Sequence, residues 1–100
     1  MKKKILNYYI YIVECSDKTL YTGITNNLEK RIKIHNNGTG AKYTRARRPV
    51  KLVYSCMLPN KSQALKYEFK TKALNRINKY KLINGEINLY DLKWNLIIYY

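Results

Sequence analysis

Four side chains that can act on an anionic group lie within one short segment, residues 20–45. The segment reads LYTGITNNLEKRIKIHNNGTGAKYTR, and among many cations it contains Tyr21, Arg31, His35 and Tyr43. Tyrosine and histidine can donate and accept protons, and the planar guanidinium of arginine matches the oxygens of a phosphate. Attraction of an anion by charge alone would not require tyrosines. The segment therefore predicts either chemistry on a bound anion or a basic surface supported by structural aromatics.

The charge of the chain indicates a polyanionic partner. Its 100 residues include 20 Lys and Arg against 6 Asp and Glu, which gives a net charge of +14. Such an excess of cations is typical of proteins that bind nucleic acid. Hydrophobic residues make up 46% of the chain, so a folded core is expected rather than a disordered basic tail. The length allows one domain, which we place at residues 1–85, followed by an apolar tail, 86–100, that is expected to pack on the same domain.

Neither a membrane span nor an export signal is expected. Asn7 interrupts the apolar N-terminal run, and no small-residue cleavage site follows it, so this run is interpreted as a buried first strand. No apolar run reaches transmembrane length. Cys15 and Cys56 lack the spacing of a metal site, and we interpret them as small buried residues in a reducing compartment. A cytoplasmic location is the resulting expectation.

A β-hairpin is expected near the N-terminus, with strands over residues 7–14 and 19–25. Both stretches are rich in β-branched and aromatic residues, and the sequence between them, CSDK, has the composition of a tight turn. In an antiparallel pair, the numbers of facing residues have a constant sum. A three-residue turn then puts Tyr11 opposite Gly23 and puts Tyr21 on the same face as Tyr11. Because glycine has no side chain, an open space is expected in front of Tyr11.

A helix is expected after the hairpin, over residues 27–36. Asn26 and Glu29 have the spacing of a capping box at its N-terminus. Arg31 and His35 are four residues apart, so they are expected to project together from one side of this helix.

The second half of the chain is expected to contain a loop, a strand and two helices. Residues 37–49 are interpreted as a mobile basic loop and residues 50–57 as a third strand. A helix is expected to begin at Ser62, and another is expected over residues 75–83. The apolar face of the helix that begins at Ser62 is expected to consist of Leu65, Phe69 and Ala73.

The order and spacing of the candidate residues resemble those of the GIY-YIG nuclease domain. The matching positions are Tyr9-Ile10-Tyr11, then Tyr21-Thr22-Gly23, then Arg31 and His35, and a lone Glu68 in a later helix. The resemblance covers about residues 7–80 and is closest to the small stand-alone bacterial branch (YhbQ-like, URI type), whose members carry runs similar to LYTGIT and GAKYTR. Tyr9 stands where the family name has Gly, and Thr22 stands where it has Ile.

This resemblance implies an α+β fold, with a small three-stranded antiparallel sheet packed against helices, and hydrolysis of phosphodiester bonds with one Mg²⁺ or Mn²⁺ ion. Tyr11 would match the general base or the tyrosine that positions the attacking water, with its pKa lowered by nearby cations. Tyr21 would orient the phosphate or the attacking water, and Arg31 would stabilise the transition state. His35 would assist through a hydrogen bond to the phosphate or to a tyrosine, and Glu68 would hold the metal ion.

Each of these assignments has a structural alternative. The two tyrosines are also ordinary strand aromatics, and the arginine is also one more cation on a solvated helix face. His35 could serve only the helix dipole, and Glu68 could form a surface ion pair with Lys72, four residues later. The resemblance also implies that an asparagine adds a further contact to the site, and the sequence does not separate the two candidates, Asn75 and Asn78.

The basic loop interleaves cations with an aromatic residue, as expected for a groove that follows a phosphate backbone and stacks a base. The expected DNA-binding residues are Gly23, Lys42, Tyr43, Arg45, Arg47 and Arg48. A disordered, generally sticky loop is the alternative. No motif that reads a base sequence is present, so recognition of branched or single-stranded DNA is expected. Two functions stay open: a metal-dependent endonuclease, acting alone or with a protein targeting partner, and a catalytically silent nucleic-acid-binding domain of the same fold.

Overall fold

Three antiparallel strands form the only sheet in the part of the chain that the computed structural model describes, residues 7–92. The strands are β1 (Tyr8–Glu14), β2 (Leu20–Thr25) and β3 (Lys51–Leu58), and their order across the sheet is β2-β1-β3. The strand at the N-terminus is therefore the central one. The expected three-stranded antiparallel sheet is confirmed.

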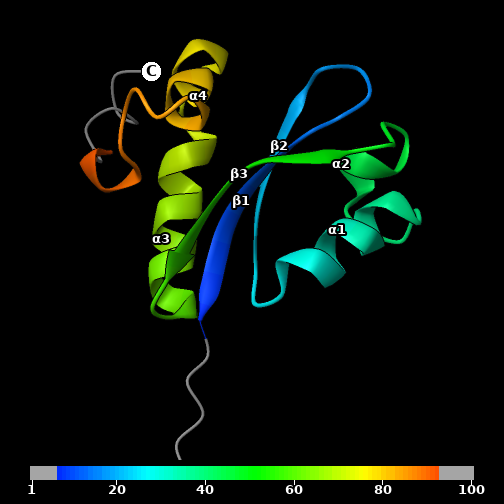
Figure 1. Ribbon diagram of the computed structural model, residues 1–100, viewed down its shortest axis with the longest axis horizontal. Helices are drawn as coiled ribbons and strands as arrows, with labels where there is room; N and C mark the ends of the chain where they lie inside the picture. Colours follow the sequence, from blue (N-terminus) through cyan, green and yellow to red (C-terminus); the bar gives the residue numbers. More distant parts are fainter. Residues whose placement is uncertain (1–6, 93–100) are drawn as a thin grey trace, which may run out of the picture.

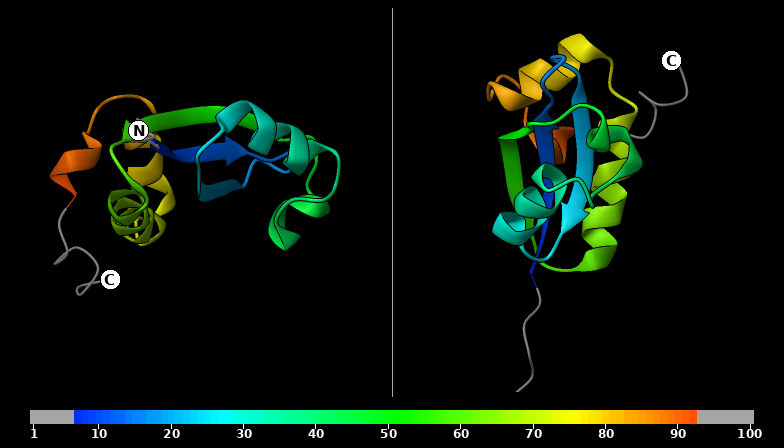
Figure 2. Two further views of the ribbon diagram at one scale, coloured as in Figure 1. Left: turned by 90° about the horizontal axis from the view of Figure 1, so that it is seen from below. Right: turned by 90° about the vertical axis from the view of Figure 1, so that its right-hand side faces the viewer.

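Helices cover both faces of this sheet. α1 (Leu28–Asn36) and the short α2 (Lys42–Arg45) lie between β2 and β3 in the chain, and β3 is followed by α3 (Lys61–Lys72), α4 (Arg76–Ile83) and the 3₁₀ helix η1 (Leu89–Asp91). In Figure 1, α1 and α2 lie on one side of the sheet, and α3 and α4 lie on the other. The two turned views in Figure 2 show the same arrangement, with the sheet as the middle layer. The expected packing of the sheet against helices is confirmed.

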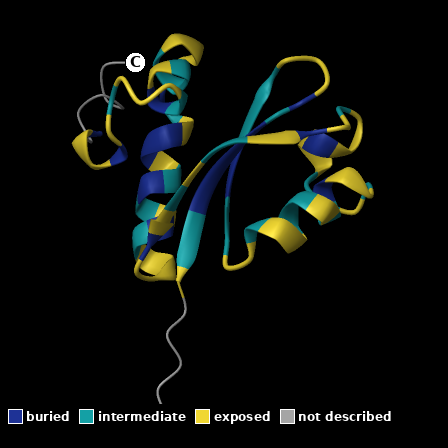
Figure 3. Ribbon diagram, viewed as in Figure 1, coloured by how far each residue is buried: buried dark blue, intermediate teal, exposed yellow. Residues whose placement is uncertain are grey.

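The alternation of side chains along β1 supplies both halves of the core. Ile10 and Ile12 point to one face, where they pack with residues of α3 and α4. Tyr11 and Val13 point to the other face, where Leu28 of α1 and its neighbours cover them. Figure 3 shows this burial as dark blue along the central strand. A strand with both faces covered reads as a nearly continuous apolar run, which is the pattern of YYIYIV.

The hairpin has the predicted register. Tyr11 pairs with Gly23, and Val13 pairs with Tyr21. Because paired residues share a face, both candidate tyrosines lie on the side of the sheet that α1 covers. The prediction of this register from the turn length is confirmed.

The N-terminal cap of α1 differs from the expectation by one residue. The side chain of Asn27, not of Asn26, accepts a hydrogen bond from the backbone amide of Lys30 at 3.1 Å. Asn27 has the extended backbone that a cap residue needs directly before the first helical residue. Glu29 therefore does not complete a capping box, and it forms an exposed ion pair with Lys33 at 3.7 Å.

The expected apolar face of α3 is wrong. Leu65 and Phe69 are 47% and 54% exposed, whereas Ala64 and Thr71 are fully buried. The buried side of α3 therefore combines small residues with Tyr67, and small side chains allow a helix to approach a sheet closely. Apolar periodicity alone could not identify this face, because the residues that pack best here are not the most hydrophobic ones.

Three smaller expectations also need correction. The segment 37–49 contains the helix α2 and is not a loop throughout. The helix α3 begins at Lys61, one residue before Ser62. Cys15 is buried, as expected, but Cys56 is only half-buried, and both thiols are free.

The apolar tail begins inside the core. Leu89 and Leu92 are 2% and 5% exposed and belong to the cluster that α3 and α4 form with the sheet. The rest of the expected tail, residues 93–100, lies outside the described residues, as do residues 1–6 at the start of the chain. Among residues 7–92, no helix has both the length and the apolar character needed to cross a bilayer.

Candidate functional site

Four of the five predicted catalytic residues meet on the face of the sheet that α1 covers. The hydroxyl oxygen of Tyr11, from β1, lies 2.8 Å from Nε2 of His35 and 3.3 Å from Nε of Arg31. The ring of Tyr21, from β2, meets the His35 ring edge-on, with centroids 5.5 Å apart. The i,i+4 spacing on α1 and the hairpin register together produce this centre, which we call the Tyr11 centre: Tyr11, Tyr21, Arg31 and His35.

Two glycines make room for this arrangement. A Cβ atom at Gly23 would lie 2.5 Å from the Tyr11 hydroxyl oxygen, and a Cβ atom at Gly40 would lie 2.7 Å from Nδ1 of His35. The space expected in front of Tyr11 is therefore not open, because the phenol ring itself lies across Gly23. The role of Gly40 was missed, because the sequence alone does not show that its backbone passes directly beside the histidine.

A threonine that sequence reasoning missed determines the protonation of the histidine. Oγ1 of Thr44 donates to the carbonyl oxygen of Ala41 at 2.9 Å, so its single proton is already used. It can then only accept from His35 Nδ1, which lies 2.8 Å away. His35 consequently has its proton on Nδ1, and its unprotonated Nε2 accepts a hydrogen bond from the Tyr11 hydroxyl. Thr44 lies in the run GAKYTR, so the family resemblance pointed to the segment but not to this residue.

Burial determines how these groups titrate. Burial lowers the pKa of His35 below its ordinary value, and the charge of Arg31 lowers it further, so the imidazole is neutral at pH 7. Burial also raises the pKa of Tyr11, although the hydrogen bond and charge of Arg31 act in the opposite direction. Arg31 therefore acts in the expected direction, but the expected net lowering of the Tyr11 pKa is wrong. Burial of the phenol outweighs the single close cation.

The centre has a buried layer and a partly exposed layer. Tyr11, His35 and Thr44 are all 0% exposed, whereas Tyr21 and Arg31 are partly exposed. Within residues 7–92, the guanidinium of Arg31 has one hydrogen bond, from Nε to Tyr11. Its terminal N–H groups are thus available to a phosphate at the surface, in the bidentate geometry that arginine favours. The buried layer orients this guanidinium and offers a proton acceptor beneath it.

Glu68 belongs to α3, in the other helical layer. Its carboxylate is 19% exposed and lies 3.4 Å from the Lys72 ammonium, so the ion pair considered as an alternative is present. Burial is the main cause that raises the Tyr11 pKa, and the charge of Glu68 is a minor cause in the same direction. The two readings of Glu68, metal ligand and surface ion pair, are therefore not exclusive.

A metal ion at this position would have one protein ligand. No group of three or more His, Cys, Asp or Glu side chains that could hold a metal occurs within residues 7–92. Mg²⁺ commonly keeps several of its waters and binds through one or two carboxylates together with substrate phosphates. A single, partly buried Glu68 that already attracts an ammonium fits this mode of binding.

The aromatic residue of the basic segment contacts other residues of the protein. The Tyr43 ring stacks on the Tyr21 ring at 6.0 Å, and the guanidinium carbon of Arg47 lies 3.9 Å from its centroid. Arg47 also forms an ion pair with Asp17 at 3.0 Å. These contacts tie α2 to the hairpin, so Tyr43 and Arg47 have structural partners in addition to the DNA contacts expected of them.

The remaining cations of the segment differ from one another. Nε of Arg48 donates to the carbonyl oxygen of Arg45 at 2.9 Å, which stabilises the turn before β3. Lys42 and Arg45 are exposed, and neither side chain has an ion pair within residues 7–92. These two side chains are therefore the ones most available to a nucleic acid.

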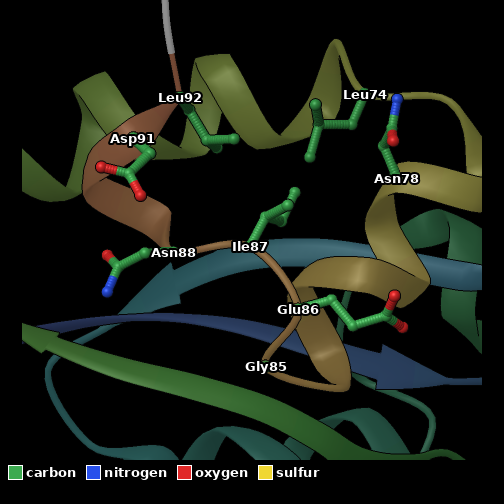
Figure 4. Close-up of a pocket in the computed structure, with 8 residues that line it drawn as sticks. All are labelled: Leu74, Asn78, Gly85, Glu86, Ile87, Asn88, Asp91 and Leu92. Atoms are coloured by element: carbon green, nitrogen blue, oxygen red, sulfur yellow. The ribbon is translucent and has the colours of Figure 1, made fainter.

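The two candidate asparagines have other contacts. The side chain of Asn75 accepts a hydrogen bond from the Asn78 backbone amide at 2.9 Å and so caps α4. Asn78 lines a pocket of about 430 Å³ between α4 and η1, together with the carboxylates of Glu86 and Asp91 (Figure 4). The two carboxylates would repel a phosphate, so the pocket between α4 and η1 is unsuited to binding one.

Comparison with known proteins supports the resemblance. The family model described as "GIY-YIG catalytic domain" matches residues 7–81 of the chain. A UPF0213 protein of Clostridium perfringens is 58% identical over 78 residues, which cover 78% of this chain and 84% of that protein. A UPF0213 protein of Staphylococcus saprophyticus is 57% identical over 77 residues, which cover 77% and 94%. The solution NMR structure of a UPF0213 protein from Bacillus halodurans has a TM-score of 0.53 and 41% identity, and the match covers 90% of this chain and 96% of that chain.

Proposed function

We propose that this chain, which belongs to the family of GIY-YIG catalytic domains, is an endonuclease that hydrolyses phosphodiester bonds of DNA with one Mg²⁺ or Mn²⁺ ion. The family indicates a nuclease that acts on nucleic acid. The choice of DNA, the dependence on a metal ion and the roles of individual residues are our proposal. A cytoplasmic location and a preference for branched or single-stranded DNA belong to it as well.

The observation that carries the proposal is the hydrogen-bonded chain beneath Arg31. A purely structural tyrosine would not require a buried histidine whose tautomer is set by a buried threonine hydroxyl. Here Tyr11 donates to His35, and His35 donates to Thr44, with both distances at 2.8 Å. Buried polar groups are costly unless they are satisfied, so such a chain is usually retained for orientation of a group that acts at the surface.

The hydrogen bonds from Tyr11 to His35 and from His35 to Thr44 provide a route for the proton of the attacking water. In this route, the Tyr11 oxygen accepts a proton from the attacking water and passes its own hydroxyl proton to Nε2 of His35. Because the Tyr11 pKa is raised, transfer during the reaction is favoured over a phenolate formed in advance. The water oxygen bonds to phosphorus, the bond from phosphorus to the leaving oxygen breaks, and His35 leaves the step as an imidazolium.

Access to the buried phenol is part of this proposal. Tyr11 is fully buried, so the attacking water must reach it past Tyr21 and Arg31, the partly exposed residues of the centre. Arg31 would hold the equatorial oxygens of the phosphate, and Tyr21 would orient the phosphate or the water. Such fixed donors stabilise developing charge more strongly where water is excluded.

Glu68 would hold the metal ion. A bound Mg²⁺ or Mn²⁺ would supply positive charge at the leaving oxygen and lower the pKa of a coordinated water. A carboxylate repels a phosphate unless a cation lies between them, and this is the physical reason to assign Glu68 to a metal ion rather than to DNA.

The catalytically silent alternative rests on two observations. Tyr11 has no exposed surface, and Glu68 already has an ammonium partner at 3.4 Å. A protein that only binds nucleic acid would be compatible with both. The charge of +14 supports binding under either function.

Glu68→Gln separates the two functions, with Glu29→Gln as its matched control. Both glutamates form an i,i+4 ion pair with a lysine, at 3.4 Å for Glu68 and 3.7 Å for Glu29. The proposal predicts that Glu68→Gln abolishes cleavage of a labelled DNA panel in Mn²⁺ but keeps or slightly tightens binding in chelator. Glu29→Gln should cut normally, with stability changed by no more than about 0.5 kcal/mol. Cleavage by Glu68→Gln above a few per cent of wild type would reject the single-metal mechanism, and wild-type binding without cleavage would favour the silent alternative.

A further inference from the structure

A second pocket borders the Tyr11 centre at the junction of β2, α2, α3 and α4. It has a volume of about 230 Å³. Its lining residues are Leu20, Tyr21, Thr22, Tyr43, Lys72 and Lys79. Pockets for drug-sized ligands are larger, about 300–1,000 Å³. This pocket therefore suits a small group, such as one phosphate with part of its sugar.

The residues that line this pocket carry positive charge and no negative charge. Lys72 and Lys79 line it, and none of its lining residues is acidic. Lys79 is half-buried, and its pKa is lowered by burial and by the charge of Lys72. The charges of Lys72 and Lys79 repel each other, and a bound anion would relieve this repulsion.

The pocket shares residues with both halves of the candidate active site. Tyr21 lines it and also meets the ring of His35 at 5.5 Å. Lys72 lines it and also contacts Glu68 at 3.4 Å. A group bound here would therefore lie beside both Tyr21 of the Tyr11 centre and the ion pair of Lys72 with Glu68. This adjacency is not expected of a general basic surface.

We infer that this pocket holds a backbone phosphate of the nucleic-acid substrate, next to the phosphate that is cleaved, with Lys79 as its main cationic contact. The inference rests on the proposed function, because it takes the Tyr11 centre as the site of cleavage. Lys79 is the main contact because Lys72 is partly neutralised by Glu68. The Tyr43 ring forms a wall of the pocket, so its stacking on Tyr21 gives the pocket its shape.

The substitution Lys79→Met, which removes the charge of Lys79, tests the inference. Lys81→Met is the matched control on the same helix. Lys81 is exposed and does not line the pocket. Binding of a fluorescent single strand and of a duplex is measured by anisotropy in chelator over a range of salt concentrations. Lys79→Met should weaken binding about five- to eightfold at 0.1 M salt and reduce the salt slope by about 0.7 for the single strand and 0.9 for the duplex. Lys81→Met should match the wild type.

Two further measurements keep the inference testable if Lys79→Met folds poorly. Lys79→Arg retains the charge and should bind as the wild type does, and the thermal melt of each variant is checked. In NMR titrations of the wild type with a short single-stranded DNA, the amide signals of Tyr21 and Lys79 should shift more than that of Lys81. Equal affinities for Lys79→Met and Lys81→Met would reject the phosphate subsite while cleavage by the wild type still supported the proposed function. Absence of both binding and cleavage in the wild type would reject both.

Discussion

The substitution Thr44→Val tests the buried hydrogen-bonded chain without touching any exposed residue. Valine keeps the branched shape of threonine but replaces the hydroxyl with a methyl group. That hydroxyl donates to the Ala41 carbonyl at 2.9 Å and accepts from His35 Nδ1 at 2.8 Å. Both Thr44 and His35 are 0% exposed, so water cannot replace the lost partner.

The expected cost follows from the donor left behind. An unsatisfied buried N–H costs about 1–3 kcal/mol, so Thr44→Val should lower the free energy of unfolding by that amount. The same substitution at Thr71 is the matched control. Thr71 is also 0% exposed, but its hydroxyl has no hydrogen-bond partner among the described residues. Thr71→Val therefore removes an unsatisfied group and should be neutral or stabilising.

Thermal and urea denaturation of the two variants measure this difference. Each kcal/mol corresponds to roughly 4–8 °C in Tm for a domain of this size. Cleavage by Thr44→Val should also fall, because Nε2 is no longer held as the acceptor of the Tyr11 proton. Equal melting temperatures for Thr44→Val and Thr71→Val would show that Thr44 does not hold His35, and the assigned tautomer would then lose its basis.

Two other predictions concern the same centre. His35 is the only histidine, and its folded-state pKa is depressed, so its contribution to stability is fully present above its unfolded pKa of about 6.5 and is lost as pH falls below that value; melts of the wild type between about pH 5 and 8 should show this loss, and His35→Gln should lack it. Gly23→Ala would place a Cβ atom 2.5 Å from the Tyr11 hydroxyl oxygen, so overpacking should lower the free energy of unfolding by about 1–3 kcal/mol and cleavage should fall; a variant with wild-type stability and cleavage would contradict this account of Gly23.

The hairpin and α1 show what local rules can predict. The register of β1 and β2 follows from a turn length and a constant sum, so the pairing of Tyr11 with Gly23 could be derived from residue numbers. The common projection of Arg31 and His35 follows equally from their spacing of four residues, which is close to one helical turn. Both depend on residues close together in the chain, where geometry leaves few alternatives.

The buried side of α3 shows where local rules fail. Leu65 and Phe69 are more hydrophobic than Ala64 and Thr71, yet the smaller pair is buried. Which side of a helix packs depends on the shape of the surface that it meets, and here that surface is a sheet formed by strands far away in the chain. The cap of α1 was assigned to Asn26 instead of Asn27 because both are asparagines, and asparagine caps equally well at either position.

Sequence by itself therefore determined the family, the three-stranded sheet, and the positions of Tyr11, Tyr21, Arg31 and His35 on one face. Tertiary structure decided how those residues are protonated and which others join them. The sign of the Tyr11 pKa shift depends on desolvation, which is a property of everything packed around the phenol. Thr44 contacts His35, and Lys79 lines the pocket beside Tyr21, through contacts between elements that spacing along the chain does not relate. Residue spacing determines in which direction side chains point from one helix or strand. The burial of a side chain and the charges around it depend on all its neighbours, which only folding brings together.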